Sequence, residues 1–206
     1  SRKMSSTIQP SNQLYLNWSS RLEEHLGTYK VDLLKTRVDI LLRNKLALDT
    51  FNSLSSLCIS TLAERDPMPE FYEMTIKFLD QIVSQKKWEF LYLDWELQLL
   101  TSIGYGLDLN KCVASGSTEN LFYISPKSGK AVSKEKGFKY DKKLLRFPSI
   151  LKYKKKYNDF NRSELVAGLS ITGFFLKKWL TYSLRNKQTM KIRQRLIDTL
   201  SNEENT

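Results

Sequence analysis

The stretch "CVASG" at residues 112–116 contains half of the pattern that a zinc knuckle requires. Two thiolates three residues apart can bind one metal ion, and a closed structural zinc site needs about four ligands. This chain has Cys112 at the first position but Ser115 at the second. Because one thiolate cannot hold the ion, the stretch predicts a knuckle without its metal.

The other residues that could do chemistry do not form a catalytic pattern. A phosphate-binding loop around Lys130 would need Gly at position 124 and Ser or Thr at 131, where the chain has Ile124 and Ala131. The glycines at 104 and 106 follow a predicted helix, whereas a dinucleotide fingerprint follows a strand. The sequence has no G-x-S-x-G elbow. His25, the sole histidine, lies in "LEEHLG", which favours a solvated loop residue over a catalytic one. We therefore expect a binding protein, not an enzyme, and no cofactor.

The chain is strongly basic, and the excess charge lies towards its C-terminus. It has 33 Lys and Arg against 22 Asp and Glu in 206 residues. Residues 138–206 hold 16 of these cations and 6 of these acids, which leaves 17 and 16 for residues 1–137. Such asymmetry attracts polyanions, either a nucleic-acid backbone or an acidic protein tail. A basic face that only keeps the protein in solution is the alternative.

Composition predicts a folded protein of a reducing compartment. Hydrophobic residues make up 41% of the chain and aromatic residues 12%, so it can bury a core. Cys58 and Cys112 are the only cysteines and make no disulfide framework, which predicts a cytoplasmic location. No apolar run approaches the roughly 18 residues of a membrane span, and the N-terminus lacks the apolar stretch of a signal peptide. We expect no membrane partner.

A β-hairpin is expected over residues 13–34. "NQLYLNW" alternates in strand period, which places Trp18 and Tyr15 on opposite faces, and "TYKVDLL" repeats the pattern. The stretch around Gly27 lets the chain reverse between the two strands. We expect Trp18 to be part of a core and Tyr15 to be exposed.

Long helices are expected after residue 39. Pro67 and Pro69 in "RDPMPE" end one helix and begin another, which should continue to a left-handed cap at Gly104. One face of this second helix repeats an apolar residue every four positions, at Leu91, Trp95, Leu99 and Ile103. The polar residues that fall outside this face are Asp94, Glu96 and Gln98.

Two more helices are expected near the C-terminus. "NRSE" at 161–164 is typical of a capping box, and the helix that follows from about Ser163 places Trp179 in an apolar stripe, which favours a core position over a binding platform. The other members of that stripe are Leu165, Leu169 and Leu176. The last helix has a stripe of cations at four-residue steps, Lys187, Lys191 and Arg195, opposite Ile192, Leu196 and Leu200. Three like charges in a row form either a solvated face or an anion site.

Four segments resemble the RecO family of bacterial DNA-repair recombination mediators. "WELQLLTSIGYGLDLNKCVASG", residues 95–116, looks like the family signature of a helix that ends in an L-G-Y-G-like turn before a Cys-containing knuckle. "ENLFYISPKSGKAVSKEKG" is similar to the second half-knuckle, and "FFLKKWLTYSLRNKQTMKIRQRL" resembles the basic C-terminal end. "QPSNQLYLNWSSRLEEHLGTYKVDLLK" is similar to the later part of the N-terminal oligonucleotide-binding barrel. The resemblance covers nearly the whole chain.

This resemblance implies a mostly α fold with a small β part. The expected domains are a partial OB-fold remnant at residues 1–36 and a helical domain at 37–206, with a degenerate zinc-knuckle insertion at 105–137. The family barrel begins several strands before residue 1, so we expect an N-terminally truncated copy whose unpaired strand edges invite self-pairing.

The knuckle departs from the family members that bind zinc through two Cys pairs. The matching positions here are Cys112, Ser115, Ser133 and Lys136. We therefore expect no bound metal, and a knuckle held by packing and hydrogen bonds. The residues expected to form its small core are Leu107, Leu109, Phe122 and Tyr123.

The resemblance implies a mediator that binds single- and double-stranded DNA and anneals complementary strands. Its implied partners are RecR and single-strand-binding protein, through which RecA is loaded on DNA, and its implied location is the bacterial cytoplasm at the nucleoid. The alternative is an adaptor that recognises the acidic, Phe-ended tail of single-strand-binding protein and binds DNA weakly. Such a tail needs an apolar slot beside cations, which we expect between the helices of residues 46–103 and the basic C-terminal end. A basic RNA-binding module is a third possibility, since charge does not distinguish RNA from DNA.

The candidate DNA contacts are exposed cations, because phosphates are neutralised by Lys and Arg. In the helical domain they are Lys154, Lys155, Lys156, Lys177, Lys178, Arg185, Lys187, Lys191 and Arg195, and on the barrel remnant Arg2, Lys3 and Arg21. Tyr15 adds an aromatic ring that could stack on a base. For the run "KYKKKYNDF" at 152–160, a solvated connector is the alternative to a DNA contact.

Overall fold

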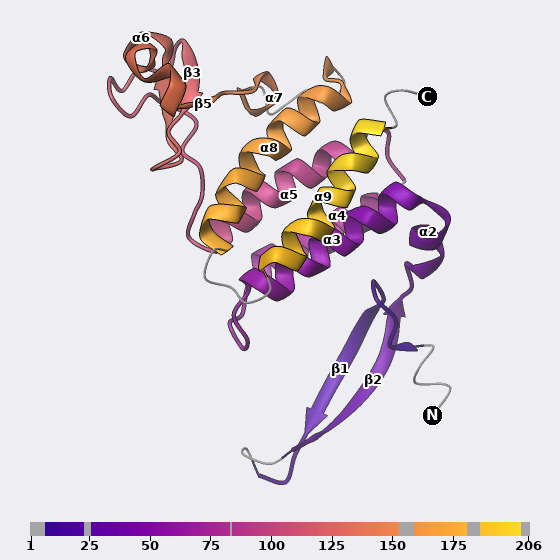
Figure 1. Cartoon of the computed structure of the whole chain (residues 1–206). Coiled ribbons are helices and arrows are strands. Elements are labelled where there is room, and N and C mark those ends of the chain that lie inside the picture. Colours follow the sequence, from indigo (N-terminus) through magenta and orange to yellow (C-terminus); the bar gives the residue numbers. More distant parts are fainter. Residues whose placement is uncertain (1–6, 23–25, 83, 153–158, 181–185, 203–206) are drawn as a thin grey trace.

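The computed structural model describes residues 7–22, 26–82, 84–152, 159–180 and 186–202. They form a mostly helical protein with a hairpin at one end and a small sheet at the other (Figure 1). The hairpin consists of β1 (Gln13–Ser19) and β2 (Thr28–Lys35). The helical bundle consists of α2 (Val38–Arg43), α3 (Lys45–Thr61), α4 (Pro69–Gln81), α5 (Glu89–Ser102), α7 (Ser149–Lys152), α8 (Arg162–Trp179) and α9 (Asn186–Asn202). The small sheet region consists of β3 (Leu121–Ile124), β4 (Ala131–Ser133), α6 (Lys134–Gly137), the 3-10 helix η1 (Phe138–Lys143) and β5 (Leu145–Arg146).

The predicted hairpin is present, but its faces are open. β1 and β2 pair antiparallel, with Leu16 opposite Val31. Tyr15 is 56% exposed, as expected, but Trp18 on the other face is 45% exposed. The predicted core position of Trp18 is therefore wrong in the described chain, because the hairpin extends away from the bundle and neither of its faces is covered (Figure 1).

Arg37 connects the base of the hairpin to the bundle through hydrogen bonds and an ion pair. Its buried guanidinium donates to Asp80 Oδ1 on α4 at 2.8 Å and to Gln13 Oε1 on β1 at 3.2 Å. Lys35 Nζ also lies 2.8 Å from Asp80 Oδ1. Partial burial of the Asp80 carboxyl raises its pKa, but hydrogen bonds from Lys35 and Arg37 outweigh this effect and hold the pKa below its usual value.

Local signals set the ends of several helices. Asn44 ends α2 and caps α3, because its side chain accepts from the Ala47 backbone N–H at 2.9 Å. The predicted capping box of Asn161 and Glu164 starts α8. Gly104 ends α5 with a φ of +85°, which confirms the predicted left-handed cap.

The single helix predicted from Pro69 to Gly104 is in fact two helices. α4 ends at Gln81, and α5 begins at Glu89 after a turn in which Lys87 has a φ of +56°. The turn lets α4 fold back on α5, where Trp95 Nε1 donates to Thr75 Oγ1 at 2.9 Å. One continuous helix would leave one of these two apolar faces in water, so burial favours the break.

α5 is buried on more sides than its apolar stripe predicts (Figure 1). Trp95 and Leu99 are buried as expected, but Leu91 and Ile103 are only partly buried, and Phe90 and Leu100 add further buried faces. Glu96, expected outside the apolar face, is also fully buried. The reason is that α4 and α8 both pack on α5, with α9 on the side of Glu96.

Glu96 is stabilised by a buried ion pair with Arg193 of α9. Arg193 Nε donates to Glu96 Oε1 at 2.7 Å, and Nη2 donates to Glu96 Oε2 at 2.8 Å and to Leu169 O at 2.6 Å. Thr172 on α8 donates to the same carboxylate. Burial lowers the pKa of Arg193, but the Glu96 carboxylate outweighs this effect and raises it. The network joins α5, α8 and α9.

The small sheet has the order β4-β3-β5 and is antiparallel. Tyr123 is buried in its small core as predicted, and Phe122 packs at the edge. The other buried members are Cys112 and Val132. Leu107 and Leu109 were expected in this core and instead pack against the main core. The segment that carries them runs along the end of α8, where the rings of Tyr105 and half-buried Trp179 stack at 3.9 Å.

None of the helices in the described part of the chain is long and apolar enough to cross a membrane.

Candidate nucleic-acid interface

The predicted row of cations lies on one exposed face of α9. Lys187, Lys191 and Arg195 are all exposed, and no ion pair joins any of them to another described residue. Leu196 and Leu200 are buried on the opposite side, as expected. A row of cations on a rigid helix can bind an anion when, as here, none of them forms an ion pair with a described carboxylate.

Ile192 does not lie opposite this row as predicted but beside it. It is half-buried and lines the same surface hollow of about 480 Å³ as Lys187, Lys191 and Arg195. Ile192 lies three positions before Arg195, and residues three positions apart are neighbours on a helix surface, so it shares the edge of the basic face. The hollow therefore combines cations with some apolar surface.

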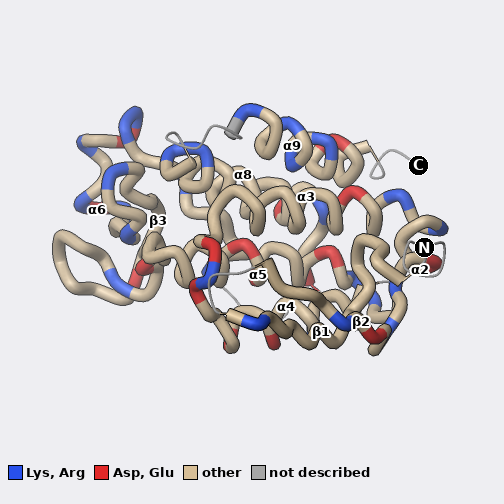
Figure 2. Tube along the Cα trace, turned by 90° about the horizontal axis from the view of Figure 1, so that it is seen from below, with Lys and Arg blue, Asp and Glu red and all other residues tan. Residues whose placement is uncertain are grey.

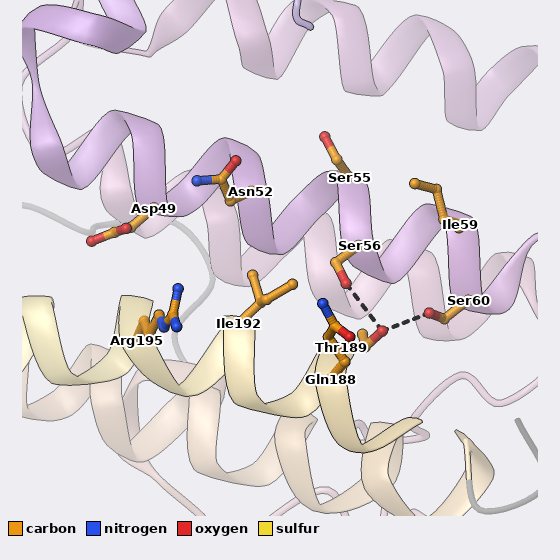
Figure 3. Close-up of a pocket in the computed structure, with 10 residues that line it drawn as sticks. All are labelled: Asp49, Asn52, Ser55, Ser56, Ile59, Ser60, Gln188, Thr189, Ile192 and Arg195. Carbon is orange, nitrogen blue, oxygen red and sulfur yellow. Dashed lines mark hydrogen bonds between the residues drawn. The ribbon is translucent and has the colours of Figure 1, made fainter. Parts of the chain in front are cut away.

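A groove between α3 and α9 continues from this hollow (Figure 3). Its volume is about 520 Å³, and Gln188, Ile192 and Arg195 contribute to both. Thr189 at the floor of the groove bonds Ser56 at 3.0 Å and Ser60 at 2.6 Å across the two helices. The remaining lining residues are Asp49, Asn52, Ser55 and Ile59.

The groove offers two kinds of contact. Ile59 on α3 is 63% exposed and Ile192 on α9 is half-buried, and both line the groove, so that both helices contribute apolar surface. Arg195 supplies a guanidinium, which can hold carboxylate or phosphate oxygens in a bidentate manner. No local pattern in the sequence predicts this groove, because α3 and α9 lie more than a hundred residues apart and only the fold brings them together.

Other candidate residues are distributed over the molecule. Lys177 is exposed at the end of α8, but Lys178 Nζ donates to Pro126 O at 2.9 Å and to Lys127 O at 3.1 Å. Its ammonium thus holds a turn of the sheet region on α8. Tyr15 and Arg21 are exposed on the hairpin, which both views place apart from α9 (Figures 1 and 2). The candidates outside the described residues are Arg2, Lys3, Lys154, Lys155, Lys156 and Arg185, as is His25.

The four positions that match zinc ligands do not form a metal site. Cys112 is buried, and its Sγ accepts from the Ser133 backbone N–H at 3.2 Å, while Lys136 is exposed. Burial of the thiol raises its pKa, but hydrogen bonds from Ser115 and Ser133 outweigh this effect and lower it to about 6. The described residues contain no group of three or more His, Cys, Asp or Glu that could hold an ion. Hydrogen bonds to Cys112 thus join the segments that carry Ser115 and Ser133, which a zinc site would join through metal–thiolate bonds.

The fold and its surface are those of a basic, mostly helical protein with small antiparallel sheets (Figures 1 and 2). The family model described as "Recombination protein O C terminal" matches residues 51–188. A "DNA repair protein RecO" of Ruegeria sp. (strain TM1040) is 40% identical over 201 residues, which are 98% of this chain and 82% of that protein. Another with the same name, of Wolbachia sp. subsp. Drosophila simulans (strain wRi), is 39% identical over 184 residues, 87% of this chain and 77% of that protein. No solved structure gives a significant match.

The chain therefore belongs to the RecO family of DNA repair proteins.

Proposed function

We propose that the chain is a DNA repair and recombination mediator that binds single- and double-stranded DNA and anneals complementary strands. The observation that carries this proposal is the exposed row of Lys187, Lys191 and Arg195, which no described carboxylate neutralises. Cations placed at helical steps along a rigid surface can follow a phosphate backbone whatever its base sequence. Membership of the RecO family supports the same function.

The proposed chemistry is electrostatic. Two complementary strands repel each other through their phosphates, and a basic surface that neutralises part of this charge lets them approach and pair. The annealing protein forms no covalent intermediate in this process and needs no cofactor. With RecR and single-strand-binding protein as partners, it helps to load RecA on coated DNA.

Binding and annealing by the full chain test this proposal. Fluorescence anisotropy with several unrelated labelled oligonucleotides should give affinities that differ little, for single strands and for duplexes. Affinity should fall steeply between about 50 and 200 mM salt, because bound phosphates release counterions. The chain should also speed the annealing of two complementary strands. Affinity that is strongly sequence-dependent, or unchanged by salt, would contradict phosphate neutralisation.

A second candidate function is an adaptor that binds the acidic, Phe-ended tail of single-strand-binding protein. The observation that favours it is the groove between α3 and α9, which is lined by exposed Ile59 at one end and by half-buried Ile192 and Arg195 towards the other (Figure 3). An acidic tail with a terminal ring needs apolar surface beside cations.

A labelled tail peptide tests this candidate. It should bind the chain, weaken with salt, and lose most of its affinity when the terminal Phe is removed. Ile59→Ser should weaken it, whereas Ile40→Ser, at a 47% exposed position on α2, should not. Equal binding of the Phe-less peptide would show that only charge is recognised, and tight tail binding with weak DNA binding would make the chain an adaptor.

A further inference from the structure

A second basic hollow lies in the small sheet region, away from α9. Its volume is about 720 Å³, and it lies between the face of β3 and β5 and the helical segment of α6 and η1. Lys and Arg gather around α6 in the same part of the molecule (Figure 2). Ten residues line the hollow: Phe122, Tyr123, Lys134, Phe138, Lys139, Tyr140, Asp141, Lys142, Lys143 and Arg146.

Two large aromatic side chains that line this hollow are exposed to solvent. Phe138 is 73% exposed and Tyr140 is 59% exposed, although aromatic residues of this size are usually buried. Both belong to η1, two positions apart, and both are among the residues that line the hollow. Exposed rings on an ordered helical turn offer flat surfaces for stacking with little loss of conformational entropy on binding.

Cations surround these rings. The hollow has five Lys or Arg and a single carboxylate, Asp141, which already pairs with Arg146 at 2.8 Å. The guanidinium of Arg146 also lies 4.9 Å from the centre of the Phe122 ring, and Lys134 Nζ lies 5.4 Å from it. These contacts fix two of the cations, and the other three, Lys139, Lys142 and Lys143, are exposed on η1.

The scaffold beneath the hollow is close-packed. A Cβ on Gly137 would lie 2.4 Å from the Tyr123 ring, so only glycine lets the end of α6 approach the sheet this closely. The Leu144 backbone N–H donates to Tyr140 O at 3.1 Å, and the Phe147 N–H donates to Phe122 O at 3.0 Å. The rings and cations are thus positioned by elements that pack on buried Tyr123.

We propose that this hollow binds unpaired nucleotides of single-stranded DNA, with bases stacked on Phe138 and Tyr140 and phosphates held by Lys139, Lys142 and Lys143. Interleaved rings and cations are the combination that single strands require, because every base has a stacking face and every linkage a negative charge. Paired bases in a duplex cannot reach such rings. The inference rests on the proposed DNA-binding function and adds a site to the α9 row, one that distinguishes single strands from duplexes.

An acidic peptide is the competing occupant, and the form of the hollow disfavours it. A Phe-ended tail needs an enclosed slot for one ring. Here the two rings themselves stand out from the surface and present faces to a ligand. A polyanion that carries a flat group at each repeat fits this arrangement better.

The test compares the full chain with its Phe138→Ala/Tyr140→Ala double variant. Because both side chains are more than half exposed, the variant should fold, which thermal unfolding by circular dichroism verifies. Tyr72→Ala, at a 50% exposed position on α4, is the matched control. The probes are a labelled thymidine oligonucleotide of about 20 nucleotides, an oligomer of the same length made of abasic units, a duplex, and an acidic Phe-ended peptide.

The double variant should lose at least about thirtyfold in affinity for the thymidine oligonucleotide, because base stacking on both rings is removed. The control should bind as the wild type does. The abasic oligomer and the duplex should bind both proteins equally, because they use only phosphate contacts at this hollow.

Three outcomes would overturn the inference. If the wild type binds the thymidine oligonucleotide and the double variant binds it within about twofold, the rings do not stack on bases, although the proposed function survives. If only the acidic peptide depends on the two rings, the hollow is a peptide site. If the wild type binds no DNA, the proposed function itself fails and this site with it.

Discussion

Glu96→Gln is expected to destabilise the fold severely, because Glu96 forms a buried ion pair with Arg193. The carboxylate is fully buried, and its partner Arg193 is only 4% exposed. The amide keeps the size of the side chain and an acceptor oxygen, but it leaves the guanidinium of Arg193 charged in the core without its counterion. Breaking one side of a buried pair typically costs about 3–5 kcal/mol, because the remaining charge is desolvated and uncompensated.

Urea unfolding followed by circular dichroism measures this loss. With a slope of about 2 kcal/mol per molar urea, the midpoint should fall by roughly 2 M. The double variant Glu96→Gln/Arg193→Met, which removes both charges, should regain more than half of the loss, because no uncompensated charge remains. Asp198→Asn, on the exposed face of α9, is the control and should change stability by less than about 0.5 kcal/mol.

A loss below about 1 kcal/mol in Glu96→Gln would refute this reasoning, since that magnitude is typical of a solvated ion pair. A double variant less stable than Glu96→Gln would also contradict it, because the stability would then depend on the packing of the Arg193 stem and not on its charge.

Two further predictions concern the knuckle and the hairpin base. Wild-type protein purified without chelator should hold no zinc, as metal analysis after dialysis would show. A variant with Ser115→Cys, Ser133→Cys and Lys136→Cys should bind about one zinc ion per chain, because it restores four thiolates. Stoichiometric zinc in the wild type would contradict a knuckle held without metal. Because the pKa of Asp80 is lowered in the folded state, its stabilisation should be complete above its unfolded pKa of about 4 and be lost as pH falls through the lower folded value. The stability difference between wild type and Asp80→Asn should therefore shrink in acid, and a difference that is constant from pH 7 to below 3 would sink this explanation.

Local signals in the sequence predicted the elements that local interactions determine. The alternation of β1, the capping box at Asn161 and the left-handed cap at Gly104 each involve residues close in the chain, and all three are present. The cation row of α9 was also predicted, because a four-residue repeat needs only the helix. Its role in DNA binding stays a prediction.

The features that sequence reasoning missed depend on residues far apart. The segment between α4 and α5 contains no Pro or Gly that would predict a break. The break is favourable because it lets the apolar faces of the two helices bury each other. The burial of Glu96 depends on Arg193, which lies 97 positions later. Phe138 and Tyr140 lie in a Lys-rich segment, and only the fold shows that they stand at a hollow with Arg146.

The salt dependence of single-stranded DNA binding tests the central claim most directly. The logarithm of the association constant is measured against the logarithm of the salt concentration for the wild type and for Lys187→Ala/Lys191→Ala/Arg195→Ala. Each lost phosphate contact should reduce the slope by about 0.7, so the triple variant should have a slope smaller by about 2. The control Lys30→Ala/Lys77→Ala/Lys86→Ala removes the same charge from exposed positions outside α9 and should leave the slope nearly unchanged. An unaltered slope in the α9 variant, or an equal reduction in the control, would contradict a phosphate-binding role for the α9 row.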